Sequence, residues 1–251
     1  MTKINFAGIV DHSTVDYPEK ICAVVYLCGC PYRCPWCQNK DLVLINEENC
    51  RITDIDEIIK QLGDNFLISA VCVTGGEPLM QKETLKLLDR IKVETELLLK
   101  IDNNGYFPDR LKTALKYLDF FTIDVKAPLD KRYGKVVGLE NNWENIVKRI
   151  IKSLNILKDW SNRKEARTTI VPGLIDKKED IVEIAKIVND FCFDYYTLQQ
   201  FRPENTLDPS YEEINSPNLE VMQELGKTAK MYLPNTEVRI VTQENGFEKI
   251  K

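Results

Sequence analysis

Three closely spaced cysteines are the residues of this chain whose types and spacing best fit a chemical role. Cys30, Cys34 and Cys37 follow the pattern C-x3-C-x2-C, and no fourth cysteine or histidine comes directly after them. Cysteine thiolates are the usual ligands of iron–sulfur clusters. Three thiolates can bind three irons of a four-iron cluster, which leaves the fourth iron for a ligand that is not protein. The spacing therefore predicts an iron–sulfur cluster with one open iron.

Two other interpretations of the three cysteines remain open from their spacing alone. A structural zinc site normally has four protein ligands. The candidates for a fourth ligand are Cys28, Cys22, Cys50 and the single histidine, His12. The three cysteines could also be inert buried thiols, although a loop that reads Pro-Tyr-Arg-Cys-Pro-Trp-Cys is unlike an ordinary buried strand.

Length and composition indicate one sizeable domain and disfavour two classes of partner. The chain has 251 residues, 43% of them hydrophobic and 29% charged, and its formal net charge is −5. An acidic chain is a poor general binder of nucleic acid. The longest strongly apolar run, residues 21–28, is too short to span a bilayer, and the first residues do not resemble a signal peptide. We therefore expect a cytoplasmic protein with no nucleic-acid or membrane partner.

The remaining cysteines carry no second cluster motif. The chain has eight cysteines, which in a cytoplasmic protein are expected as metal ligands or buried thiols rather than disulfides. Cys22, Cys72 and Cys192 lie in apolar runs and are expected in the core. Cys50 precedes a predicted helix and has no informative spacing. We expect a single cluster.

Apolar runs that alternate with amphipathic segments indicate the elements that position these residues. Strands are expected at residues 21–27, 69–74, 95–101, 119–125, 166–171 and 194–199. Helical spacing of apolar residues appears in the sets Ile55, Ile58, Ile59, Leu62; Val147, Ile150, Ile151, Leu154; and Ile181, Ile184, Ala185, Val188. Thr53 is the expected N-cap of the first helix. Six strands with intervening helices predict a parallel α/β fold, either an open barrel or a doubly wound sheet.

Polar motifs follow the predicted strands, where parallel α/β folds bind their ligands. The second strand ends in Gly75-Gly76-Glu77, and two glycines allow close approach of a backbone or a positive φ. The third ends in Asp102-Asn103-Asn104-Gly105, which could also be an ordinary turn. The fourth carries Asp124 and leads to Lys126, which share one strand face and could be a plain salt bridge. Arg167 lies near the start of the fifth.

The charges of these motifs suit a zwitterionic ligand that also carries a positive charge. The acidic side chains could neutralise an ammonium or a sulfonium group, and Lys126 or Arg167 could bind a carboxylate. S-adenosylmethionine (SAM) presents all of these charges. The residues alone therefore indicate a site for such a ligand beside a metal cluster.

The motifs, taken in order, resemble those of the radical SAM superfamily, in which SAM binds the open iron. Within it, the chain resembles the glycyl-radical-enzyme activases, above all the anaerobic ribonucleoside-triphosphate reductase activating proteins, and also the pyruvate formate-lyase activating enzymes. The matching segments are His12 to Pro18, the cysteine loop through Asn39, Gly75 to Leu79, Asp102 to Gly105, Asp124 to Lys126 and Arg167 to Gly173. The resemblance covers about residues 6–203. It implies a partial (β/α)6 TIM-like barrel over residues 1–203. After it, the sequence pattern predicts a C-terminal helical extension over residues 204–251, with a helix at about 217–231 and an edge strand at 236–241.

The resemblance also implies a role for each candidate residue. Cys30, Cys34 and Cys37 would bind one 4Fe–4S cluster, and Trp36 would pack near the SAM adenine. Gly75, Gly76 and Glu77 would bind the methionyl amino group. Asp102, Asn103 and Asp124 correspond to a monovalent-cation site, and Lys126 and Arg167 to groups near the SAM carboxylate. Asp16, Gln38 and Asn39 lie where the substrate peptide would approach.

The implied activity is the reductive cleavage of SAM and removal of a glycine α-hydrogen from a partner enzyme, expected to be anaerobic ribonucleotide reductase. A flavodoxin or ferredoxin would supply the electron. No acid–base side chain is required.

Several positions depart from the activase pattern and keep other functions open. Glu19 stands where a glycine is usual, Gln38 where many activases have histidine, and Asn103 where the lyase activator has threonine. The ribose-side histidine is absent, and Gln200 or Arg202 could replace it. His12 is expected to be structural, before the first strand. The alternatives are a radical SAM enzyme for a small molecule or modified base, of the 7-carboxy-7-deazaguanine synthase type, and a non-catalytic iron–sulfur electron carrier.

Overall fold

The computed structural model describes residues 2–251 and divides the chain into two compact units. Unit 1 comprises Met1–Pro31 and Asp41–Thr122, and unit 2 comprises Tyr32–Lys40 and Ile123–Lys251. The cysteine loop therefore contributes Cys30 to unit 1 and Cys34 and Cys37 to unit 2. In residues 2–251 we find no helix that is long and apolar enough to cross a membrane.

Unit 1 is built on five strands in the order β3-β1-β2-β4-β5. They are β1 (Lys3–Ser13), β2 (Cys22–Leu27), β3 (Arg51–Asp54), β4 (Ala70–Gly75) and β5 (Leu98–Asn103). β2, β4 and β5 are parallel, whereas β1 runs antiparallel to β2 and β3. Nearly every residue of β2 and β4 is buried, as expected for central parallel strands. The next strand, β6 (Phe120–Asp124), begins in unit 1 and ends in unit 2.

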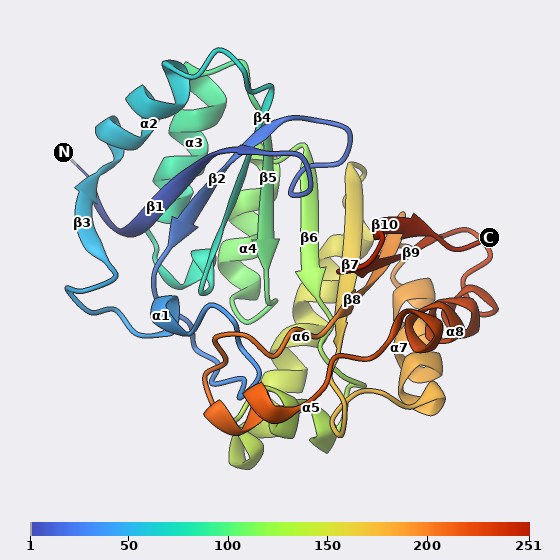
Figure 1. Cartoon of the computed structure of the whole chain (residues 1–251). Coiled ribbons are helices and arrows are strands. Elements are labelled where there is room, and N and C mark those ends of the chain that lie inside the picture. The colour runs from blue at the N-terminus through green and yellow to red at the C-terminus, as the bar shows by residue number, and fades with distance from the viewer. Residues whose placement is uncertain (1) are drawn as a thin grey trace. The chain divides into compact units, whose positions relative to one another are not determined.

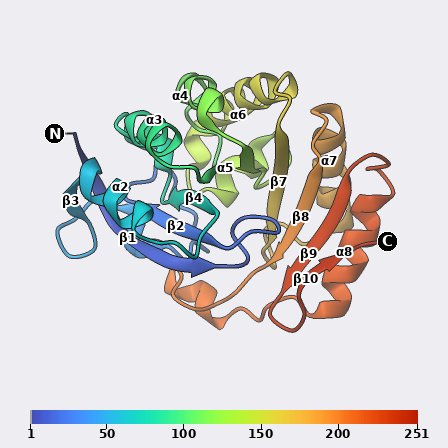
Figure 2. The same ribbon diagram turned by 90° about the horizontal axis from the view of Figure 1, so that it is seen from above.

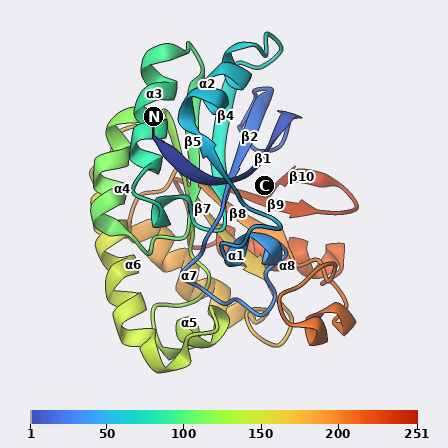
Figure 3. The ribbon, with the colours of Figure 1, turned by 90° about the vertical axis from the view of Figure 1, so that its left-hand side faces the viewer.

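Helices lie between strands of unit 1 and cover one face of its sheet: α2 (Ile55–Gly63), α3 (Thr84–Glu94) and α4 (Pro108–Ala114) (Figure 1). Unit 1 also contains most of the short helix α1 (Lys40–Val43), which follows the cysteine loop, and the 3₁₀ turns η1 (Pro78–Met80) and η2 (Leu115–Tyr117). Figure 3 shows α3 and α4 alongside β4 and β5. The four apolar residues that predict α2 are all buried, which confirms its inward face. Its N-cap is Asp54 rather than Thr53, because the chain stays extended through β3 and the Asp54 carboxylate accepts from Asp56 N.

Unit 2 has the strand order β7-β8-β9-β10. These strands are β7 (Arg163–Ile170), β8 (Tyr195–Gln200), β9 (Glu237–Thr242) and β10 (Gly246–Lys249). Its helices are α5 (Lys131–Val136), α6 (Trp143–Lys158), α7 (Lys178–Asp190) and α8 (Leu219–Lys230), with 3₁₀ turns η3 (Glu140–Asn142) and η4 (Pro209–Glu213). β7, β8 and β9 are parallel, and α7 and α8 lie along one side of β8 and β9 (Figure 2).

The six predicted core strands correspond to β2, β4, β5, β6, β7 and β8, and the last predicted helix corresponds to α8. Three further strands were not predicted: β1, β3 and β10. Two expectations are therefore wrong. β9 is not an edge strand, because β10 pairs with it, and His12 lies inside β1 rather than before the first strand.

Two further sequence expectations need correction. Cys22 and Cys72 are fully buried as predicted, but Cys192 is exposed, because it follows the end of α7 in a turn with a φ of 54°. Cys50 precedes strand β3, not a helix.

Glu19 has a φ of 63°, in the left-handed region that favours glycine, which explains why glycine is usual at that position.

Candidate active site

Within unit 1, the Gly75-Gly76-Glu77 turn packs directly against the backbone that leads into Cys30. Gly76 N donates to Leu27 O at 3.0 Å, and Glu77 N donates to Gly29 O at 2.8 Å. A Cβ on Gly75 would lie 1.9 Å from Leu27 O, and one on Gly76 would lie 2.4 Å from Gly29 O. The two glycines are therefore required because the chain's own backbone occupies this space. The turn and Cys30 are held in a fixed relation.

The Glu77 side chain organises this turn from inside. Glu77 is 1% exposed, and its carboxylate accepts from Leu79 N at 2.9 Å, Asn103 Nδ2 at 2.5 Å and Asn104 N at 2.7 Å. A buried carboxylate needs such donors. The end of β4 is thereby tied to the end of β5, which brings together predicted residues from two motifs.

Asn104 also reaches the cysteine loop, a link that sequence reasoning missed. Its Nδ2 lies 3.7 Å from Cys30 Sγ, and its Oδ1 accepts from Tyr106 N at 3.1 Å. In the sequence, Asn104 is recognisable only as part of a turn motif. No spacing in the sequence shows that a turn after one strand will reach a cysteine 74 residues earlier.

Asp102 pairs with a buried lysine that sequence reasoning also missed. The Lys100 side chain is fully buried, and its Nζ forms an ion pair with Asp102 Oδ1 and lies 3.6 Å from Cys72 Sγ. In the sequence, Lys100 stands out as a charged residue within the apolar part of β5, which could have indicated a buried ion pair. Burial of an ammonium is costly unless it is paired, so Lys100 and Asp102 form one unit.

In unit 2, the cysteine loop is anchored by its tryptophan. Cys37 N donates to Cys34 O at 3.0 Å, which closes a turn. Trp36 is 8% exposed and its Nε1 donates to Val136 O at 3.0 Å. Burial raises the pKa of the Cys37 thiol, whereas Lys126 acts in the opposite direction.

Lys126 connects this loop to the end of β6. Its Nζ lies 2.8 Å from Asp124 Oδ2 and 4.9 Å from the centre of the Trp36 ring. Burial disfavours the charged ammonium, but Asp124 and Cys34 outweigh it, so the pKa of Lys126 lies above its usual value. Tyr133 OH adds a hydrogen bond to Asp124 O at 3.3 Å. The predicted pair Asp124 and Lys126 is therefore an ion pair that lies beside the cysteine loop.

Arg167 has a buried acidic partner on its own strand. Its Nη2 lies 2.9 Å from Glu165 Oε2, and Glu165 is 1% exposed. Thr197 Oγ1 donates to the other oxygen of Glu165 at 2.5 Å. Sequence reasoning missed Glu165, which holds the Arg167 guanidinium in place. Gln200 is a candidate to replace the ribose-side histidine. Its Nε2 donates to Pro217 O, and its Oε1 accepts from Gln243 N.

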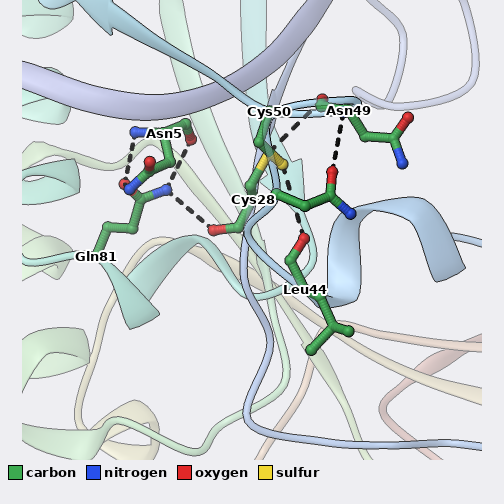
Figure 4. Close-up of a disulfide and its surroundings, with 7 residues drawn as sticks. Asn5, Cys28, Leu44, Asn49, Cys50 and Gln81 are labelled. Atoms are coloured by element: carbon green, nitrogen blue, oxygen red, sulfur yellow. Dashed lines mark hydrogen bonds between the residues drawn. A yellow bond between two sulfur atoms is a disulfide. The ribbon is translucent and has the colours of Figure 1, made fainter.

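A disulfide joins Cys28 to Cys50 in unit 1, which corrects the expectation that cysteines here are ligands or thiols (Figure 4). β2 brings Cys28 next to the segment that precedes β3, and Gln81 Nε2 donates to Cys28 O at 3.0 Å. The bond spans 22 positions and encloses the whole cysteine loop. It also removes Cys28 and Cys50 as candidate zinc ligands.

The residues present suit the iron–sulfur cluster that the motif implies. In residues 2–251 no three His, Cys, Asp or Glu side chains already form a group suited to a metal ion. The fit rests instead on the donor set, three thiols that iron–sulfur clusters use, and on Asn104, a buried amide donor beside Cys30 Sγ.

Comparisons with known proteins agree with these features. The family model for the radical SAM superfamily matches residues 24–188. A candidate glycyl-radical enzyme activating enzyme of Methanocaldococcus jannaschii is 37% identical over 237 residues, which cover 94% of this chain and 95% of that protein. The pyruvate formate-lyase-activating enzyme of Staphylococcus epidermidis is 27% identical over 75% of this chain and 77% of that protein.

Solved structures support the fold. The crystal structure of Streptococcus suis SuiB bound to the precursor peptide SuiA superimposes with a TM-score of 0.67 and 17% identity, over 87% of this chain and 48% of that chain. The parallel strands found in each unit and the similarity to radical SAM structures identify a partial TIM-barrel-type fold. This is the fold that the sequence predicts. The chain is an enzyme that belongs to the radical SAM superfamily, among the glycyl-radical-enzyme activating enzymes.

Proposed function

We propose that this enzyme cleaves SAM reductively and installs a glycyl radical on a partner enzyme, anaerobic ribonucleoside-triphosphate reductase. The observation that carries the proposal is the hydrogen bond from Glu77 N to Gly29 O, since it fixes the Gly75-Gly76-Glu77 turn beside Cys30. A turn that binds an amino acid next to a cluster ligand is what SAM activation at an open iron requires.

In this proposal Cys30, Cys34 and Cys37 bind one 4Fe–4S cluster. When bound, the cluster would supply the single electron, received from the flavodoxin or ferredoxin, that reductive cleavage of SAM and removal of the glycine α-hydrogen require. The protein's contribution is to position SAM and to exclude water.

The residues of the strand-end motifs would hold the charged ends of SAM. The Glu77 carboxylate already accepts three hydrogen bonds, so Gly75 and Gly76 would offer backbone groups to the methionyl ammonium. Lys126 and Arg167 would bind the carboxylate, each while held by its acidic partner. Trp36, whose indole nitrogen is already bonded, would offer its ring to the adenine.

Asp102, Asn103 and Asp124 would supply oxygen ligands to a monovalent cation. Lys100 lies against Asp102 and would supply part of the positive charge there. Partial activity without added sodium or potassium would be consistent with this arrangement.

The choice of partner rests on the motif at residues 12–18, which is most similar to that of the reductase activators. Asp16, in this motif, accepts from Ser13 Oγ at 2.5 Å and is fixed near the start of β2. The electron donor would be a flavodoxin or a ferredoxin in the cytoplasm.

Anaerobic reconstitution tests the cofactor part of this proposal. The wild type should bind about four irons per chain and, with dithionite, should form 5′-deoxyadenosine from SAM. Alanine at Cys30, Cys34 or Cys37 should abolish both. Cys192→Ala is the matched control and should retain both, because Cys192 is exposed and outside the motif. Retention of the cluster by any of the first three variants would contradict the ligand assignment.

A further inference from the structure

One buried residue of unit 1, Asn104, contacts both the proposed SAM-binding turn and a proposed cluster ligand. Asn104 is 4% exposed. Its backbone N donates to Glu77 Oε2 at 2.7 Å, and its side-chain Nδ2 faces Cys30 Sγ at 3.7 Å. The larger radius of sulfur makes this separation suitable for a hydrogen bond. A single residue therefore joins the SAM-binding turn to a cluster ligand.

The orientation of the Asn104 amide follows from its second contact. Asn104 Oδ1 accepts from Tyr106 N at 3.1 Å. If the amide were turned over, its NH₂ group would face the Tyr106 N–H, and two donors would oppose each other. The turn that follows β5 thus fixes the donor end of the amide toward the sulfur.

We propose that Asn104 is a positioning residue that holds Cys30 and raises the reduction potential of the cluster that Cys30 binds. This inference rests on the proposed function. Reduction adds one electron from the donor to the cluster, so negative charge on the sulfurs increases. An N–H donor stabilises that added charge, and hydrogen bonds to the sulfurs are one of the means by which proteins set cluster potentials.

Asn104 also has a structural role, because its backbone N donates to Glu77. The backbone N of Asn104 donates to Glu77 and its side chain faces Cys30, so one residue contacts both groups. Asn104 therefore links the turn that carries Gly75 and Gly76, the proposed SAM-binding groups, to Cys30, a proposed cluster ligand.

An anaerobic redox titration of the reconstituted protein, followed by electron paramagnetic resonance, tests the inference. Asn104→Asp keeps the oxygen that accepts from Tyr106 N but replaces the donor with an acceptor. At a fixed potential its ratio of reduced to oxidised cluster should fall about tenfold, equivalent to about 59 mV for one electron. Asn104→Ser keeps a short acceptor for the turn and should shift the potential in the same direction.

Asn103→Ala is the matched control, because Asn103 donates to Glu77 but not to Cys30. It should weaken SAM binding and leave the potential at the wild-type value. Unchanged potentials in both Asn104 variants, or an equal shift in Asn103→Ala, would overturn the inference. If the wild type binds iron and cleaves SAM in the same experiment, such a result leaves the proposed function intact. A wild type that binds no cluster would refute both.

Discussion

At the scale of single residues, the proposed site depends on buried and partly buried polar groups that bond to one another. Glu77, Asn103 and Asn104 form one network in unit 1, and Lys100 and Asp102 form a second. In unit 2, Asp124 and Lys126 pair beside Trp36, and Glu165 holds Arg167. Each proposed SAM contact is therefore made by a group whose position is already set, which lowers the cost of ordering it on binding.

The Glu77 carboxylate should be needed for both stability and SAM binding. In Glu77→Gln, an NH₂ group would face one of the three donors, so we expect a loss of about 1–3 kcal/mol in the free energy of unfolding. Urea denaturation and calorimetric titration with SAM measure the two effects. Glu47→Gln, at an exposed position, should change neither. Wild-type stability and affinity in Glu77→Gln would show that the network is dispensable.

Cys22 should make stability depend on pH in the alkaline range. Burial, with a further contribution from Asp16, raises the pKa of the Cys22 thiol from 9.0 to about 11. The folded state retains the proton more tightly than the unfolded state, so this contribution is complete below pH 9 and is lost as the pH rises toward 11. A shift of two units corresponds to about 2–3 kcal/mol.

The measurement is the free energy of unfolding of wild type and Cys22→Ala between pH 8 and pH 11. The variant should be less stable at pH 8 because of its cavity, yet it should lose less stability as the pH rises. Parallel curves for the two proteins would contradict the assignment of this thiol.

At the scale of elements, the contact of the β4 turn with the cysteine loop is the critical packing feature. In Gly76→Ala the new Cβ would lie 2.4 Å from Gly29 O, so the turn must move away. We expect a loss of about 2 kcal/mol or more in stability and poor retention of iron after reconstitution. Gly8→Ala in β1, where no atom lies within 4 Å of the new Cβ, is the control and should behave as wild type. Normal iron content in Gly76→Ala would show that the contact does not position Cys30.

The elements themselves could be predicted where the pattern was local. β2 and most of β4 are continuous apolar runs, and α2 and α7 show helical spacing, so the sequence was sufficient for them. β1 and β10 were not predicted from the sequence, because each is largely exposed or only half-buried and so lacks a continuous apolar run. Their strand state depends on pairing with distant partners, which periodicity does not report.

The site could be predicted only in part for the same reason. The cysteine spacing and the strand-end motifs identify residues whose chemistry is specific. Lys100, Asn104 and Glu165, by contrast, become informative only when the fold brings them to Asp102, Cys30 and Arg167. The pairing of Cys28 with Cys50 likewise depends on the position of β3 beside β1.

At the scale of the whole molecule, the disulfide closes a loop around the three cysteines. The chain-entropy model gives about 3 kcal/mol for a loop of this length. Under oxidising conditions Cys50→Ser should be less stable than wild type by about this amount, and with a strong reductant the two should be nearly equal. Thiol titration of the unfolded wild type should show two more thiols after reduction. An unchanged thiol count would contradict the disulfide.

The partial barrel as a whole is suited to the proposed protein substrate. A peptide substrate must bring a glycine to SAM, which distinguishes an activase from an enzyme that acts on a free metabolite. A partial barrel is suited to this task, because a barrel closed by eight strands is filled by its own side chains.

The most direct test is to mix the reconstituted protein anaerobically with SAM, a reductant and an anaerobic ribonucleotide reductase, and to record the electron paramagnetic resonance spectrum. We predict a glycine-centred radical with a resolved α-hydrogen doublet, and 5′-deoxyadenosine formed in proportion to it. A protein that cleaves SAM but gives no glycyl radical on reductase or formate-lyase partners, while it turns over a small molecule, would contradict the central claim.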